Sequence, residues 1–119
     1  MSYELTIMPG TEIALFCWSG PITLEDRKRN VERITQFLSE NGISQLILDT
    51  RHLDRRMTTT EGYEFGAWVP EKIRGVKVAV VHHSSDVEGR FVENVAANRG
   101  AHSRSFLSLE EAQKWLDGK

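Results

Sequence analysis

Two short apolar stretches decide the fold of this chain, ISQLIL at residues 43–48 and VKVAVV at residues 76–81. Each stretch runs into a polar cluster: Asp49, Thr50 and Arg51 after the first, and His82, His83, Ser84 and Ser85 after the second. Nearly continuous apolar strands that alternate with helical segments are typical of a parallel or mixed sheet covered by helices. Because open α/β sheets bind ligands and partners at the carboxyl ends of their strands, the two clusters mark the candidate site.

Length and composition indicate one soluble domain spanning residues 1–119, with 39% apolar and 27% charged residues. The formal net charge of −2 provides no electrostatic footprint for nucleic acid. No apolar run approaches the roughly 20 residues that a transmembrane helix needs. The N-terminal residues MSYEL lack the basic and apolar regions of a signal peptide, so a cytoplasmic location is expected.

Periodicity and capping signals predict the element order β-β-α-β-α-β-α-β-α. Two strands joined by Pro9-Gly10 form a hairpin, and the later strands alternate with helices around one sheet. The expected strands are residues 3–8, 12–18, 43–48, 76–81 and 104–107, and the expected helices begin at Thr23, Thr58, Ser85 and Ser108.

The helix that begins at Thr23 has the clearest pattern. Asp26 stands three residues after Thr23, as in a capping box, and Gly42 supplies a left-handed stop. Its apolar residues recur at helical spacing and predict one buried stripe: Leu24, Val31, Ile34, Phe37 and Leu38.

The helix expected over residues 58–68 is weaker. Thr58 and Glu61 form a capping-box pair, whereas Gly62 and Gly66 lower helix propensity and Pro70 is expected to end or kink the helix.

Histidines 82 and 83 are the first candidate functional residues. Adjacent residues on a strand point to opposite faces, so these two rings cannot readily bind one metal ion, and neither a metal site nor a cofactor is expected. A strand end passing into a helix cap is the favoured interpretation, and a pH-sensitive or anion-contacting histidine is the alternative. Ser84 lacks the Gly-x-Ser-x-Gly elbow of a nucleophile.

Asp49, Thr50 and Arg51 are the second group. Asp49 could act as a general base, but the sequence fixes no second titratable partner, and an aspartate at such a place commonly accepts hydrogen bonds from loop amides. A binding role is therefore favoured over catalysis, and no catalytic residue is assigned. Cys17, between Phe16 and Trp18, is interpreted as a small buried hydrophobe rather than a nucleophile.

The helix from Thr58 adds two further features. Thr58–Thr60 precede or begin it, which suggests either capping or phosphorylation at a helix N-terminus. Tyr63, Phe65 and Trp68 place three aromatic side chains on one weak helix, and core packing absorbs only one face. Tyr63 is therefore expected to be exposed on a partner surface, a lipid-pocket wall or a dimer contact.

Three segments carry a resemblance to a known family: Leu48–Arg51, Arg90–Gly100 (RFVENVAANRG) and Arg104–Leu116 (RSFLSLEEAQKWL). With the element order, they resemble the bacterial SpoIIAA-like proteins of the STAS superfamily, which are related in fold to CRAL-TRIO lipid-binding domains. The resemblance implies a five-stranded mixed sheet covered by about four helices, usually non-enzymatic and used for regulatory protein contacts or small ligands. The phosphorylatable serine of anti-sigma-factor antagonists has no counterpart here, where residues 49–54 read DTRHLD and residues 58–62 read TTTEG.

These observations favour a non-enzymatic regulatory or binding domain that acts through a protein partner or a small ligand at the strand carboxyl ends. A small carrier of an apolar or lipid-like ligand, lined by Phe65 and Trp68, is the first alternative. An enzyme that uses Asp49 with His82 or His83 is the second. Exposed aromatic side chains are also compatible with a homodimer.

Overall fold

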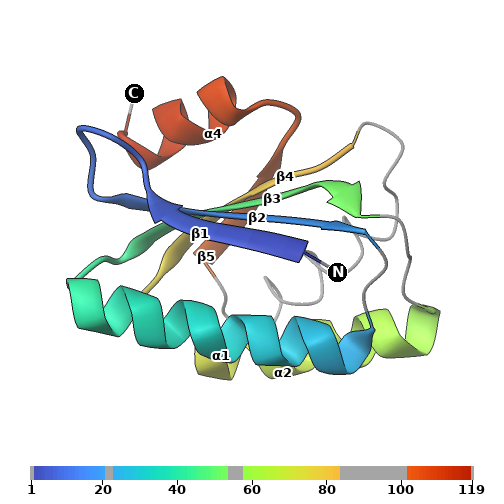
Figure 1. Cartoon of the computed structure of the whole chain (residues 1–119). Helices are drawn as coiled ribbons and strands as arrows, with labels where there is room; N and C mark the ends of the chain where they lie inside the picture. Colours follow the sequence, from blue (N-terminus) through green and yellow to red (C-terminus); the bar gives the residue numbers. More distant parts are fainter. Residues whose placement is uncertain (1, 21–22, 54–57, 84–101, 119) are drawn as a thin grey trace.

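The computed structural model describes residues 2–20, 23–53, 58–83 and 102–118 (Figure 1). The helix expected from Ser85, with Ser84 before it, lies outside these residues. The strands are β1 (Ser2–Ile7), β2 (Ile13–Gly20), β3 (Gln45–Leu53), β4 (Lys77–Val81) and β5 (His102–Phe106). The described helices are α1 (Leu24–Asn41), α2 (Thr59–Lys72) and α4 (Leu109–Leu116), and none is long and apolar enough to cross a bilayer.

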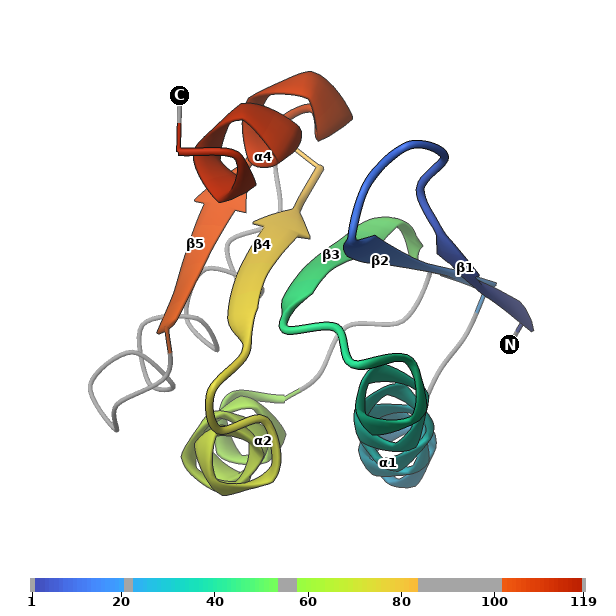
Figure 2. The ribbon, with the colours of Figure 1, turned by 90° about the vertical axis from the view of Figure 1, so that its left-hand side faces the viewer.

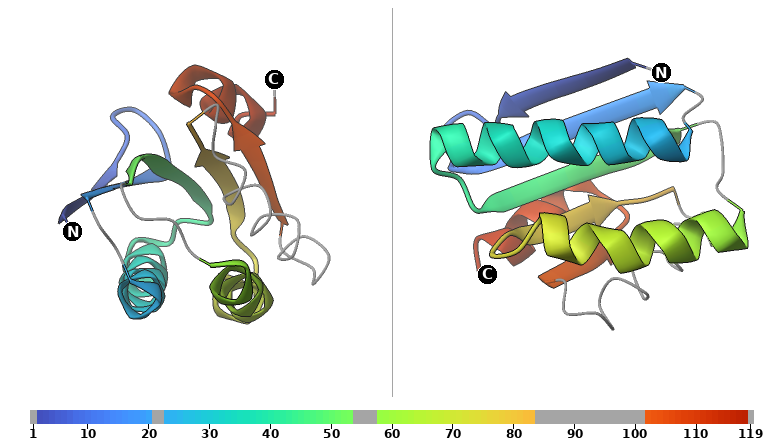
Figure 3. Two further views of the ribbon diagram at one scale, coloured as in Figure 1. Left: turned by 90° about the vertical axis from the view of Figure 1, so that its right-hand side faces the viewer. Right: turned by 90° about the horizontal axis from the view of Figure 1, so that it is seen from below.

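The five strands form one mixed sheet in the order β1-β2-β3-β4-β5, which is also their order along the chain. β1 pairs antiparallel with β2, and every other neighbouring pair is parallel. Helices α1 and α2 lie side by side on one face of the sheet, and α4 lies on the other (Figures 2 and 3). The predicted α/β class and five-stranded mixed sheet are confirmed.

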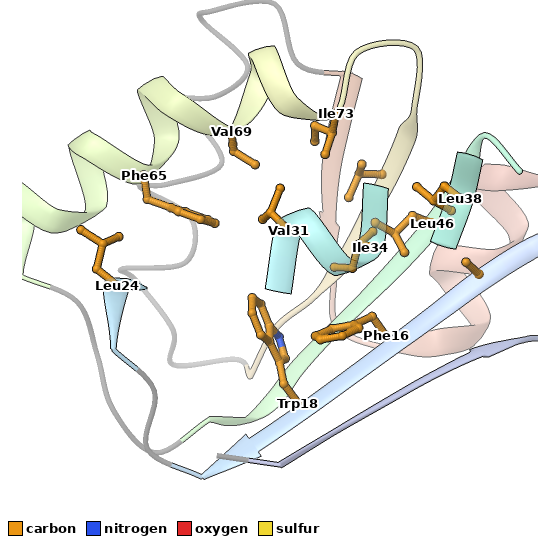
Figure 4. Close-up of a cluster of buried hydrophobic side chains, with 12 residues drawn as sticks. Phe16, Trp18, Leu24, Val31, Ile34, Leu38, Leu46, Phe65, Val69 and Ile73 are labelled. Atoms are coloured by element: carbon orange, nitrogen blue, oxygen red, sulfur yellow. The ribbon is translucent and has the colours of Figure 1, made fainter. Parts of the chain in front are cut away.

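The alternation of β2 divides the core into two clusters. Phe16 and Trp18 point toward α1 and α2, whereas Ile13 points toward α4. Figure 4 shows the first cluster, in which the apolar stripe of α1 meets side chains from β2 and α2. The second cluster consists of Ile13, Ile47, Ala79, Val81, Ala112 and Leu116.

The predicted helix signals of α1 are present. Thr23 and Asp26 form a reciprocal capping box, with Asp26 N–H donating to Thr23 Oγ1 at 3.1 Å and Thr23 N–H donating to Asp26 Oδ2 at 3.2 Å. Gly42 ends the helix at φ 64°, a left-handed conformation that favours glycine.

Helix α2 is longer than expected, because it continues through Pro70 to Lys72. Proline removes one N–H from the helix ladder, but Ile73 N–H still donates to the Val69 carbonyl at 3.2 Å and closes the last turn. Because Pro70 lies near the end of α2, the loss of this one backbone hydrogen bond does not end the helix.

The central strand also differs from its expected range, residues 43–48. β3 begins at Gln45 and runs on to Leu53, because β2 accompanies it as far as the Gly20–Leu53 pair. Asp49, Thr50 and Arg51 therefore lie inside β3 rather than after it. The neighbouring β4 ends here, at Val81 opposite Asp49, and β5 ends beside it, at Phe106 opposite Val81.

Candidate functional site

Asp49 and Arg51 form an ion pair within β3. Asp49 lies on the side of the sheet that carries α4, because it alternates with Ile47 of the second core cluster. The β2–β3 register shifts between Cys17 and Ser19, beside Arg51, whose side chain turns back to Asp49. Arg51 binds the carboxylate with two side-chain donors, Nε to Oδ1 at 2.9 Å and Nη2 to Oδ2 at 2.8 Å. Its backbone N–H also donates to Oδ1, at 3.2 Å. Asp49 is 3% exposed, so this arginine neutralises a buried charge.

The environment of Asp49 keeps it ionised. Burial acts to raise the pKa of Asp49, but hydrogen bonds from the Arg51 side chain and backbone, with the arginine charge, outweigh burial and lower the pKa. A carboxylate held ionised by a bidentate guanidinium is poorly placed to accept a proton from a substrate. The geometry therefore favours a structural or binding role for Asp49 over the general-base alternative.

Cys17 lies beside this pair on β2, with Sγ 3.9 Å from Asp49 Oδ2. Burial raises the pKa of the Cys17 thiol, and the negative charges of Asp49 and Glu4 raise it further. A raised pKa leaves little reactive thiolate, in line with the expectation that Cys17 is not a nucleophile. It is half-buried rather than buried, because α4 packs over β3, β4 and β5 and leaves this part of β2 uncovered.

Thr50 and His82 make hydrogen bonds that do not involve the Asp49 carboxylate. Thr50 Oγ1 donates to the Val81 carbonyl at 2.9 Å. His82 is buried, and its backbone N–H donates to the Phe106 carbonyl at 2.9 Å, whereas His83 is exposed. No group of three or more potential metal ligands occurs within the described ranges.

The N-terminal half of α2 has one exposed side and one buried side. Thr58, Thr59 and Thr60 are exposed, and Thr58 caps the helix by accepting a hydrogen bond from Glu61 N–H at 3.1 Å. Tyr63 is 51% exposed, as its sequence context predicts. We call Thr58–Tyr63 the α2 surface.

Trp68 differs from Tyr63, because it is half-buried between α1 and α2. Its ring lies 6.1 Å from that of Phe65, and two ammonium groups approach it, Lys28 at 5.4 Å and Lys72 at 5.5 Å. These contacts account for Trp68 as part of the helix–helix packing, and a ligand is not needed to explain its position.

A cavity of about 340 Å³ lies at the amino ends of the strands, opposite to the edge that the sequence analysis selected. Its basic side chains are Arg74, Lys77 and His102, but Lys77 Nζ donates to the Trp115 carbonyl at 2.9 Å and so helps to hold α4. The basic run around residues 72–77 is the sequence signal that could have indicated it. Its lining residues are Ser44, Gln45, Pro70, Ile73, Arg74, Gly75, Val76, Lys77 and His102.

Comparison with known proteins provides a likeness in structure alone. No protein-family model matches the sequence, and no curated protein matches it. The anti-sigma factor antagonist SpoIIAA, in its unphosphorylated form, superposes with a TM-score of 0.64 at 14% identity, covering 99% of this chain and 98% of that one. An uncharacterised DUF3478-family protein from Shewanella loihica PV-4 superposes with a TM-score of 0.63 at 15% identity, covering 97% and 92%. These superpositions cover nearly the whole of all the chains compared, and this protein therefore has a SpoIIAA-like fold.

Proposed function

We propose that this protein is a non-enzymatic regulatory domain, located in the cytoplasm, that binds a protein partner through the α2 surface. The exposure of Tyr63 carries the proposal. A tyrosine that leaves half of its surface in water on a helix offers a rigid amphipathic contact of the kind enriched in protein interfaces.

Three further observations support a binding role. The α2 surface lies at the same end of the molecule as the carboxyl end of β3 (Figure 1), where this class of sheet commonly meets its partners. Asp49, the carboxylate that was the candidate general base, is already bound by Arg51. One of the structures that superpose on this chain is that of a protein whose name, anti-sigma factor antagonist, describes a regulator.

The three threonines of the α2 surface suggest how the contact is regulated. Thr58–Thr60 are exposed at the beginning of α2, where the positive end of the helix dipole stabilises an added phosphate. Phosphorylation here would place negative charge beside Tyr63 and change the partner surface without altering the core.

The first experiment is native mass spectrometry of the protein as purified from its source cells. A retained protein partner or a phosphorylated form supports the proposal. A reproducible small ligand, released on denaturation, would instead support the alternative of an apolar carrier. Phe65 is buried in the first core cluster, so this alternative has no support from the described contacts.

Partner capture then tests the location. Tyr63→Ala should abolish or strongly weaken capture of the partner, because the contact loses its aromatic anchor. Leu107→Ala is the matched control, since Leu107 is 53% exposed and lies after β5, outside the α2 surface. Equal capture by wild type and Tyr63→Ala would refute this location of the interface.

A further inference from the structure

β1 is an edge strand with one open side. It pairs with β2, and within the described part of the chain no strand pairs with its other side. Two of its apolar side chains are unusually exposed, Tyr3 at 44% and Ile7 at 40%. A long apolar edge strand is a template for pairing with another chain.

The direction of the backbone groups follows from one hydrogen bond. Met8 N–H donates to the Ile13 carbonyl at 2.9 Å, one step beyond the Ile7–Ala14 pair. Hydrogen-bonded and non-hydrogen-bonded pairs alternate in an antiparallel ladder. Ser2, Glu4 and Thr6 therefore bond to β2, whereas Tyr3, Leu5 and Ile7 point their N–H and C=O groups outward.

The side chains of these same three residues share one face. The Tyr3 ring stacks on Phe16 with centroids 5.3 Å apart, and Leu5 packs against the first core cluster, so all three lie on the α1 side. The open edge thus combines free backbone groups with an apolar strip.

Common protective devices are missing from this edge. β1 contains neither proline nor lysine, and its register with β2 is regular from Ser2 to Ile7. Its one charged side chain, Glu4, points to the face opposite the apolar strip.

We infer that β1 pairs antiparallel with β1 of a second copy of this chain, about a two-fold axis at Leu5. Tyr3 then lies opposite the partner's Ile7, and Leu5 lies opposite the partner's Leu5. Every outward N–H and C=O of Tyr3, Leu5 and Ile7 has a partner in this register. The two sheets become one continuous sheet, with both α1 helices on the same face.

The alternative registers are poorer for two reasons. A two-fold axis at Glu4 places two carboxylates directly opposite each other, which is unfavourable. An axis at Thr6 leaves Tyr3 opposite Pro9, outside the paired strand. With the axis at Leu5, Glu4 lies opposite the partner's Thr6.

Sedimentation velocity over a range of protein concentrations tests the dimer. We expect a concentration-dependent dimer, and Tyr3→Pro should weaken it at least tenfold, because proline removes an outward N–H that the monomer does not use. Tyr3→Phe is the control and should dimerise like wild type. A monomer at every concentration, or a dimer that Tyr3→Pro leaves unchanged, would overturn the inference.

Charge substitutions at exposed Thr6 test the register even if the proline variant fails to fold. Thr6→Lys should tighten the dimer several-fold by facing the partner's Glu4, and Thr6→Glu should loosen it by a similar factor.

In a Cys17→Ser background, Tyr3→Cys and Ile7→Cys should each resist disulfide cross-linking alone but cross-link when mixed. Cross-linking of either variant with itself, or equal affinities for the two Thr6 variants, would refute this register.

Discussion

Asp49 and Arg51 make part of the stability of the fold dependent on pH. The lowered pKa of Asp49 means that its stabilising contribution is present above the unfolded pKa, about 3.9, and is lost as pH falls through the folded value. Arg51→Met removes the donors and leaves burial to raise the pKa of Asp49, which penalises the folded state at neutral pH.

We therefore expect wild type to be more stable than Arg51→Met near neutral pH, and the difference to narrow between about pH 5 and about pH 3. Urea unfolding at a series of pH values measures it. Arg74→Met, which changes an exposed arginine outside this pair, should show a difference from wild type that stays constant with pH. A constant difference for Arg51→Met as well would contradict the assigned role.

For single residues, the sequence predicted which side chains are exposed better than it predicted which side chains contact one another. The spacing of Asp49 and Arg51 would place them on one face once both belong to a strand, but the strand was expected to end at Leu48. The approach of Cys17 depends on the β2–β3 register, which no local pattern specifies. Tyr63 was correctly expected to be exposed, because one helix face cannot bury three aromatic side chains.

Helix α2 begins at a capping box that can be tested by a pair of substitutions. Thr58→Ala removes the oxygen that accepts the Glu61 N–H, and should lower the free energy of unfolding by about 1 kcal/mol. Thr58→Ser keeps an acceptor oxygen and should stay close to wild type. Chemical denaturation of the two variants measures the effect, and equal losses would indicate that the cap contributes little.

Local sequence signals predict where some helices and strands begin or end, but not all of them. The cap at Thr58 could be predicted from the sequence, because it depends only on the Thr58 side chain and the Glu61 amide three residues later. The continuation of α2 through Pro70 was not, since packing of Val69 and Ile73 in the first core cluster holds the last turn. β3 was extended in the same way by a neighbouring strand, beyond the apolar residues that predict it.

The whole molecule depends on the cluster between α1, α2 and the sheet. Val31 is buried there (Figure 4), so Val31→Asp places an unpaired charge in the core and should unfold the protein. Glu32→Asp, at the adjacent exposed position of α1, should remain folded. Circular dichroism distinguishes the two, and a folded Val31→Asp variant would show that this cluster tolerates charge.

The overall architecture was predictable because the type and order of the described elements, though not all of their boundaries, follow from period and caps, and β-α alternation permits few topologies. The helix expected from Ser85 lies outside the described residues and stays a prediction. Function was less accessible, because the contacts of the polar groups near the end of β3 depend on the pairing with β2 and its irregularity, which no local pattern specifies.

The strand order carries a consequence for how the protein is made. Each strand pairs with the strand that precedes it in the chain, so the edge that receives a new strand is complete before that strand is synthesised. Nearest-neighbour pairing of this kind keeps the sequence separation between contacts short, which favours rapid folding. We expect the sheet to grow on the ribosome one strand at a time, beginning with the hairpin of β1 and β2.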